Sequence, residues 1–217
     1  MPNEYGSHVK GWDATAPKYD LMTAPIEGWL LGPSRPWIFE RVRGKVLEIG
    51  VGTGVNFKYV PKEVKYTGTD VSPGMLELAR QRANEMGFIA ELQLADATKL
   101  PFEDHSFDCV ISTYVFCCVP DEKKALAESL RVLKPGGSLL LANHVGSHHG
   151  AIHKMQQALD KLTVPRMGEY FSRRPLETLR ELGAEVVEVE SSFLGIIERI
   201  HAKPATEGAQ PMNLDKD

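Results

Sequence analysis

Short apolar runs alternate with helix-length segments along most of this chain, from Lys45 to His201. Because one parallel strand can follow another only through a long crossover, this alternation is typical of a mainly parallel sheet with helices on both faces. The predicted strands cover residues 46–49, 66–69, 89–94, 109–113, 138–142, 185–189 and 193–201, and the predicted helices cover 73–86, 122–133 and 175–182. The sequence thus predicts a doubly wound α/β fold.

The last two apolar runs break the alternation. They are joined by only Glu190, Ser191 and Ser192, a link too short for a crossover, so we predict an antiparallel hairpin at one edge of the sheet. Residues 9–42 and 146–174 also fall outside the alternation. Ligands of open α/β sheets bind at the carboxyl ends of the strands, and we expect both segments to close over that edge as lids.

Composition limits the classes of partner. The 217 residues carry a formal net charge of −4, so no overall positive field attracts a nucleic acid backbone. No apolar run has the length of about 18 residues that a transmembrane helix needs, and the N-terminal residues lack the pattern of a signal peptide. The three cysteines show no disulfide spacing, which favours a reducing compartment. We therefore expect a cytoplasmic protein that binds no nucleic acid.

A glycine-rich turn follows the first predicted strand. Glycine at positions 50, 52 and 54 lets the backbone approach a ligand closely, beside the amide groups of a helix start. A dinucleotide fingerprint needs its third glycine at position 55, which is Val55, so a nicotinamide-dependent dehydrogenase is disfavoured. Asp70 lies twenty residues after Gly50, at the end of the second strand, where its carboxylate can accept hydrogen bonds from both ribose hydroxyls. Asp96 ends the third strand, where it can receive the exocyclic amine of adenine.

Four segments in this order closely resemble the class I S-adenosylmethionine-dependent methyltransferases. The similarity is greatest to the methyltransferase type 11 branch, which includes ubiquinone and menaquinone C-methyltransferases and bacterial phospholipid N-methyltransferases. The matching segments are Val46–Gly54, Gly68–Leu76, Asp96–Asp108 and Arg131–Gly137. The resemblance implies a seven-stranded sheet in the order 3-2-1-4-5-7-6, with strand 7 antiparallel. We expect an N-terminal helical lid at 1–44, the methyltransferase domain at 45–203, and a disordered tail at 204–217.

The same resemblance implies S-adenosylmethionine as cofactor and S-adenosylhomocysteine as product. It assigns Glu48 and the glycine loop to the methionine part, Asp70 to the ribose, and Met75 to the face of the adenine. The edge of the adenine falls to Asp96 and Ala97. The predicted cofactor site comprises Tyr19, Glu48, Gly50, Gly52, Gly54, Asn56, Asp70, Val71, Met75, Asp96, Ala97 and, near the methionine part, Thr113.

Two residues are predicted to take part in catalysis. His144, at the carboxyl end of the fifth predicted strand, is the candidate general base, and a hydrogen-bonded histidine that supports the sheet edge is the alternative. Tyr19 resembles the N-terminal tyrosine that closes over the cofactor in many relatives, so we assign it to cofactor binding or acceptor orientation. His148, His149 and His153 lack a carboxylate or cysteine at ligand spacing, and no metal site is predicted.

The acceptor is predicted to be a small molecule or a lipid. Residues 113–120 and 143–145 resemble a bacterial subgroup of phospholipid or quinone methyltransferases, related to membrane-associated thiol methyltransferases. We favour the amine of phosphatidylethanolamine, with a quinone precursor or a small thiol as alternatives and a non-catalytic cofactor-binding module as the alternative from another class. Cys117 and Cys118 are expected to be buried, although they also suit thiol or arsenical chemistry.

Residues 26–43 mix aromatic and aliphatic side chains with arginines. Packing against the sheet as a cap on the cofactor is the favoured interpretation. Such a mixture also suits a segment that lies on a bilayer surface, and peripheral contact with the inner membrane surface is the alternative.

Overall fold

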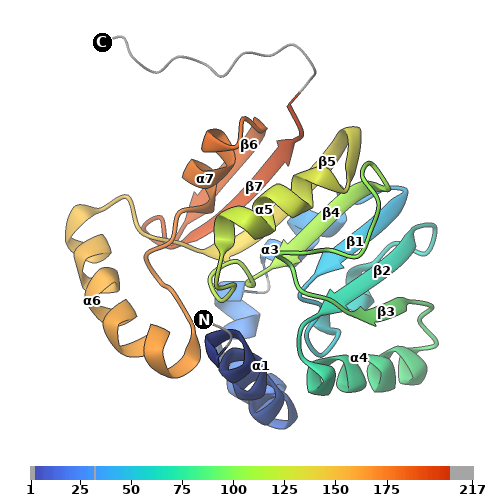
Figure 1. The fold of residues 1–217 in the computed structure, drawn as a ribbon, viewed down its shortest axis with the longest axis horizontal. Coiled ribbons are helices and arrows are strands. Elements are labelled where there is room, and N and C mark those ends of the chain that lie inside the picture. The colour runs from blue at the N-terminus through green and yellow to red at the C-terminus, as the bar shows by residue number, and fades with distance from the viewer. Residues whose placement is uncertain (1–2, 32, 206–217) are drawn as a thin grey trace.

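The computed structural model describes residues 3–31 and 33–205, which fold around a seven-stranded sheet (Figure 1). The strand order is β3-β2-β1-β4-β5-β7-β6. The strands are β1 (Lys45–Ile49), β2 (Lys65–Asp70), β3 (Glu91–Leu94), β4 (Phe107–Thr113), β5 (Leu133–His144), β6 (Glu185–Ser192) and β7 (Ile197–Lys203). The first five strands pair in parallel, and β7 is antiparallel to both of its neighbours. The predicted fold class and strand order are confirmed.

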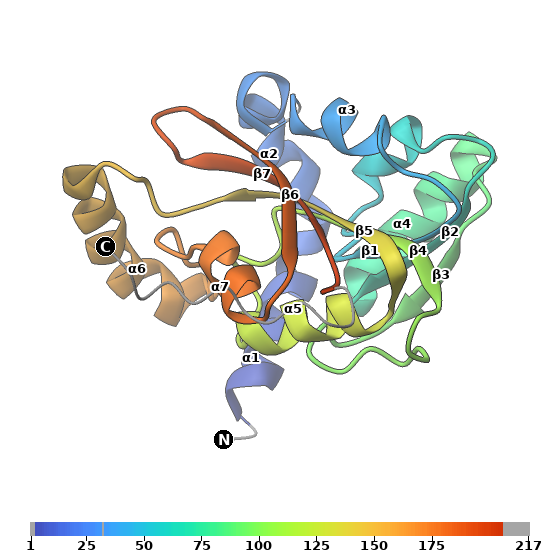
Figure 2. The same cartoon turned by 90° about the horizontal axis from the view of Figure 1, so that it is seen from above.

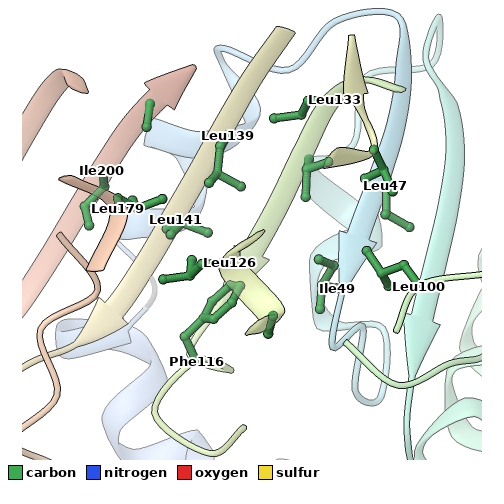
Figure 3. Close-up of a cluster of buried hydrophobic side chains, with 14 of the residues drawn as sticks. Leu47, Ile49, Leu100, Phe116, Leu126, Leu133, Leu139, Leu141, Leu179 and Ile200 are labelled. Atoms are coloured by element: carbon green, nitrogen blue, oxygen red, sulfur yellow. The ribbon is translucent and has the colours of Figure 1, made fainter. Parts of the chain in front are cut away.

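Helices cover both faces of the sheet, as the view from above shows (Figure 2). On one face α5 (Glu122–Arg131) and α7 (Pro175–Glu181) bring Leu126 and Leu179 against the leucines of β5 (Figure 3). On the other face α3 (Ser34–Phe39) and α4 (Pro73–Met86) form a second apolar cluster with β1 and β4. Burial of apolar side chains on both faces explains why the strands consist of almost continuous apolar runs.

The strand boundaries differ from the predicted ones by up to five residues, and the differences at β3 and at the last hairpin change which residues lie in the sheet. Strand β3 begins at Glu91, and Ile89, predicted to lie within it, is 93% exposed. The predicted hairpin link at 190–192 is wrong, because β6 continues through Ser192 and the turn occupies residues 193–196. Phe193, Leu194 and Gly195 adopt positive φ there. The turn is as apolar as a strand, so hydrophobic periodicity does not reveal it.

The chain before β1 is helical. It consists of α1 (Asn3–Thr15), the short 3-10 helix η1 (Ala16–Lys18), α2 (Tyr19–Ile26), the π-helical turn η2 (Glu27–Leu31) and α3. A further helix, α6 (Gly150–Met167), stands apart from the two helical layers at the edge where the parallel strands end (Figure 1).

Part of the segment 26–43 lies in the core. Trp37, Ile38 and Phe39 are at most 8% exposed, because α3 uses these side chains to cover the sheet. This burial favours packing against the sheet, and peripheral membrane contact of the segment stays a prediction. The side chains of Ile26 and Trp29 lie outside the described part of the chain. Within residues 3–31 and 33–205, no helix combines the length and the apolar character needed to cross a bilayer. The predicted disordered tail lies outside the described residues from 206 onward.

Candidate active site

A pocket lies at the carboxyl ends of β1, β2 and β4, where the sheet changes the direction of its connections. Nine of the twelve residues predicted for the cofactor line it, all except Glu48, Gly54 and Asn56. The lining consists of Trp12, Tyr19, Ile49, Gly50, Gly52, Thr69, Asp70, Val71, Met75, Ala95, Asp96, Ala97, Thr113, Tyr114, Val115, Cys118, Val119 and Pro120. The sequence did not single out the run from Tyr114 to Pro120 as pocket wall, because nothing in its apolar composition separates wall from core.

The glycine loop after β1 has its shape for two reasons. Gly50 has a φ of +70°, and a Cβ atom there would lie 2.3 Å from Cγ2 of Val115. Gly54 has a φ of +80°, and its Cβ would lie 2.3 Å from the ring of Phe57. Positive φ and close approach both require glycine. Gly54 therefore shapes the loop without lining the pocket.

The carboxylate of Asp70 ties together three elements at the pocket edge. Its Oδ2 accepts a hydrogen bond from Gly52 N at 2.9 Å, and its Oδ1 accepts one from Ser72 N at 2.9 Å. The Ser72 hydroxyl in turn caps α4 by accepting from Met75 N at 3.1 Å. Burial raises the pKa of Asp70 from its ordinary value, and the two amide donors oppose that rise. The end of β2, the glycine loop and the start of α4 thus share one acidic group.

The second acidic group in the pocket, Asp96, is held by its own loop. Its Oδ1 accepts from both the backbone N and the Oγ1 of Thr98, each at 2.8 Å. This local pattern is an Asx-type turn, which fixes the orientation of the carboxylate beside Ala95 and Ala97.

Glu48 lies beneath the loop and is fully buried. Its Oε1 accepts from Asn56 Nδ2 at 2.5 Å, and its Oε2 accepts from the hydroxyl of Tyr66. Asn56 Nδ2 also donates to Thr113 Oγ1 at 3.0 Å. Burial raises the pKa of Glu48 to about 7 against the opposing effect of these donors. Two residues predicted to touch the cofactor therefore support the loop from below.

Arg35 completes this buried network, and sequence reasoning missed it. Its guanidinium pairs with Glu27 through Nε–Oε1 and Nη2–Oε2 contacts of 2.5 and 2.9 Å. It also donates to Asn56 Oδ1 and, at 3.2 Å, to Thr113 Oγ1. Only 8% of its side chain is exposed. Ion pairs on a helix are spaced three or four residues apart, whereas Glu27 and Arg35 are eight residues apart. The sequence therefore did not indicate this contact.

The N-terminal helices are fastened to the cofactor loop and to α4. Asp13 Oδ1 accepts from Ser72 Oγ at 2.5 Å and from Gly74 N at 2.9 Å. The rings of Trp12 and Tyr19, both in the pocket wall, meet edge to face with centroids 6.2 Å apart. This arrangement holds two aromatic side chains over the site.

A second fastening of the N-terminal segment involves Asp20. It accepts from Thr53 Oγ1 at 2.6 Å and forms an ion pair with Arg82 of α4. The other expected lid, 146–174, contributes none of the described residues that line the pocket.

Cys117, Cys118, His144 and Glu169 meet beside the pocket, and we call them the thiol cluster. The two Sγ atoms are 3.6 Å apart, and His144 Nε2 lies 3.1 Å from Glu169 Oε1. The imidazole stacks on Phe171 with centroids 4.9 Å apart. Both cysteines are buried as expected, and Cys118 lines the pocket. His144, the predicted base, does not line it.

The cluster favours separated charges. Hydrogen bonding to Cys118, together with the nearby imidazole, lowers the pKa of Cys117 to about 6 although burial opposes this. Burial also opposes the charged form of His144, but Cys117 and Glu169 raise its pKa to about 10. An imidazolium beside a thiolate is therefore the favoured state near neutral pH.

The comparisons with known proteins agree with this geometry. A family model described as a methyltransferase domain matches residues 47–141. Phosphatidylethanolamine N-methyltransferase of Cereibacter sphaeroides is 36% identical over 118 residues, which is 54% of this chain and 58% of that protein. The ubiquinone/menaquinone biosynthesis C-methyltransferase UbiE of Chromobacterium violaceum is 30% identical over 97% of this chain and 83% of its own length.

The chain spans little more than half the length of the first curated relatives that it matches. A solved S-adenosylmethionine-dependent methyltransferase from Methanosarcina mazei shares the fold, with a TM-score of 0.62 and 24% identity over 79% of this chain and 98% of that chain. The pocket, the motifs and the UbiE match over most of both chains agree. The chain belongs to the class I S-adenosylmethionine-dependent methyltransferases, and its cofactor is S-adenosylmethionine.

Proposed function

We propose that this protein transfers a methyl group from S-adenosylmethionine to a lipid-like acceptor, and that the acceptor group is the amine of phosphatidylethanolamine. The observation that carries the transfer reaction is the joint presence of Asp70, Asp96 and the glycine loop in one pocket. Similarity to a phosphatidylethanolamine N-methyltransferase supports the choice of acceptor.

The roles proposed for the lining residues follow from their positions. Asp70 accepts hydrogen bonds from the ribose hydroxyls, and Asp96 receives the adenine amine on the carboxylate oxygen that Thr98 does not occupy. Val71 and Met75 contact the adenine, while Gly50 and Gly52 allow the methionine part to approach the backbone. Five further residues shape the methionine end of the pocket. Tyr19 and Thr113 line it, and Glu48, Gly54 and Asn56 support it without lining it.

When bound, S-adenosylmethionine supplies a methyl group on a sulfonium, which accepts the bonding electron pair and leaves as a thioether. The acceptor lone pair must lie in line, about 3 Å from the methyl carbon, so the protein contributes mainly position and exclusion of water. Tyr114, Val115, Val119 and Pro120 give the pocket an apolar wall that suits this task. Tyr19, half-buried in the wall of the same pocket, orients the acceptor.

A quinone precursor is the second candidate acceptor, supported by the match to UbiE over most of both chains. A small thiol is the third, and a module that binds cofactor without turnover is the alternative of another class. The purified protein should be incubated with labelled cofactor and, in separate reactions, phosphatidylethanolamine vesicles, a quinone precursor or a small thiol. Mass analysis should find the label on the lipid amine. Label on another acceptor would replace the lipid assignment, and calorimetric cofactor binding without any transfer would support the non-catalytic module.

We propose that His144 serves the acceptor rather than the cofactor. Because its imidazole is mostly protonated near neutral pH, only its minor neutral form takes up the proton that the acceptor amine must lose. His144→Ala is expected to slow turnover by about 100-fold or more, the usual size of a general-base effect, with unchanged affinity for cofactor. Steady-state rates and calorimetry on the same preparations measure the two effects. His148→Ala, which removes an exposed histidine at the same edge, is the control and should keep full activity. Full activity of His144→Ala on its acceptor would refute the assignment.

A lipid acceptor requires a surface that meets the bilayer, and we propose α6 for it. Three large apolar side chains spaced three and four residues apart on this helix are exposed, and lysines 154 and 161 lie beside them in sequence. They are Met155 at 66%, Leu159 at 41% and Leu162 at 57%. An apolar helix face with adjacent lysines suits an anionic membrane surface.

Met155→Glu is expected to reduce binding to anionic phosphatidylglycerol vesicles by about tenfold, because it replaces apolar contact with charge repulsion. Co-sedimentation with vesicles measures the bound fraction. The matched control is Ile89→Glu, since Ile89 is 93% exposed and lies just before β3, an edge strand of the sheet far from α6 in the strand order. Equal losses in both variants would indicate a general charge effect and remove α6 from the proposal.

A further inference from the structure

Cys117, Cys118 and Glu169 are brought together by segments that lie far apart in the sequence. Each contributes one ligand atom, and these atoms all lie within 4.8 Å of one another. Across residues 3–31 and 33–205, no other group of three histidine, cysteine or acidic side chains is so arranged. His148, His149 and His153, the residues weighed for metal binding from the sequence, take no part in it.

We propose that Cys117, Cys118 and Glu169 bind a divalent cation of zinc-like, thiophilic character beside the acceptor side of the pocket. The proposal concerns a resident ion, and it does not depend on which acceptor is methylated.

The sulfur geometry fits such an ion. With zinc–sulfur bonds of about 2.3 Å and a tetrahedral angle, two thiolates on one zinc stand about 3.8 Å apart. The Sγ atoms of Cys117 and Cys118 are 3.6 Å apart. Two thiolates and one carboxylate oxygen are donors that zinc accepts, and three protein ligands leave a fourth position for water or a substrate atom.

A disulfide between the same residues is a poorer use of the pair. Adjacent Cα atoms lie about 3.8 Å apart, whereas ordinary disulfides span at least about 4.4 Å. The pair is better arranged to share a cation than to form a bond.

The surroundings of the ligands support binding. Glu169 is held by His144 Nε2 at 3.1 Å, the kind of histidine–carboxylate contact that orients metal ligands. On the other side of that imidazole, His144 Nδ1 is buried and has no hydrogen-bond partner among the described residues.

The nearest arginine is already engaged elsewhere. Arg173 donates to the backbone oxygens of Phe116, Val119 and Pro120, and its guanidinium stacks 3.7 Å from the ring centre of Tyr170. It braces the loop that carries the cysteines instead of forming an ion pair with them. Because Cys118 lines the pocket, the fourth position of the cation would face the acceptor side.

The test uses the full chain, without acceptor, loaded with Zn²⁺ or Co²⁺ under reducing conditions. We expect one zinc per chain after gel filtration, measured by elemental mass spectrometry, and a thiolate-to-cobalt charge-transfer band with tetrahedral d–d absorption. Cys118→Ser and Glu169→Gln should each weaken zinc binding by about 100-fold or more. Cys109→Ser is the matched control, because Cys109 is a buried thiol in β4 outside the cluster, and it should keep one zinc per chain.

Circular dichroism and calorimetric binding of S-adenosylmethionine report whether each variant folds. If Cys118→Ser fails to fold, Glu169→Gln decides the question, since it keeps both thiols and lies at a partly exposed position. Less than a tenth of an equivalent of zinc on the folded wild-type protein would overturn the proposal. A cobalt charge-transfer band that survives in Cys117→Ser/Cys118→Ser would overturn it as well. Neither result affects the methyl-transfer proposal, which rests on cofactor binding and turnover.

Discussion

Replacing Asp70 with alanine is expected to weaken binding of S-adenosylmethionine by about 100-fold or more. Two hydrogen bonds from ribose hydroxyls to a carboxylate are lost, and bonds to charged groups contribute about 1.5–3 kcal/mol each. The change also leaves the amides of Gly52 and Ser72 without their carboxylate acceptor, which loosens the glycine loop and the start of α4. Isothermal titration calorimetry with S-adenosylhomocysteine measures the loss without turnover.

Asp104→Ala is the control for this experiment. Asp104 is an exposed aspartate paired with Arg131 in the loop before β4, at the opposite edge of the sheet from the pocket. Its removal should leave cofactor affinity unchanged. If Asp70→Ala bound cofactor within threefold of the wild-type protein while remaining folded, the ribose assignment would be wrong.

Replacing Arg35 with methionine is expected to lower the free energy of unfolding by about 3–5 kcal/mol, the usual cost of removing one partner from a buried ion pair. Methionine fills most of the volume but leaves Glu27 without its partner and Asn56 Oδ1 without its arginine donor, while Thr113 keeps only Asn56 as donor. Because these residues lie beneath the glycine loop, cofactor affinity should fall together with stability. Urea unfolding followed by circular dichroism gives the free energy.

Arg43→Met is the control, because it shows whether losing an arginine outside the buried network also lowers the free energy of unfolding. Arg43 is exposed and donates only to the backbone oxygen of Val42 among the contacts described for it, so its variant should unfold within about 0.5 kcal/mol of the wild-type protein. The double variant Arg35→Met/Glu27→Gln should recover part of the loss, because it removes the uncompensated charge. A loss with Arg35→Met no larger than that with Arg43→Met would contradict the buried network.

The positions that could be predicted from the sequence are those where function is fixed by local geometry. Asp70 ends β2 and Asp96 lies two residues after the end of β3. Because the carboxyl ends of parallel strands meet at one edge, strand order alone brings the two together. At position 50, the presence of glycine itself indicates a backbone with positive φ. Each of these signals requires only the residue and the element that it ends.

The positions that were missed depend on contacts between distant segments. Glu169 lies 52 residues from Cys117 along the chain, and no periodicity places one beside the other. Arg35 looked like a surface arginine because its partners come from η2, the segment after the glycine loop and β4. The hydrogen bonds of Glu48 to Asn56 and Tyr66 were likewise not foreseen, and its assignment to the cofactor stays a prediction. Tertiary packing decides such cases.

The hydrogen bonds from the start of α4 to Asp13 couple two equilibria, the docking of α1 and the binding of the cofactor. Asp13 accepts hydrogen bonds from Ser72 and Gly74, and Asp70 accepts one from the backbone N of Ser72. Detachment of α1 therefore disturbs the same turn that a bound ribose would stabilise. Because coupling free energy is reciprocal, the factor by which the cofactor protects α1 from opening equals the factor by which a docked α1 tightens the cofactor. The docked N-terminal helix α1 thus acts like a second, covalently attached ligand. The fraction of molecules in which α1 is docked sets the apparent affinity for the cofactor.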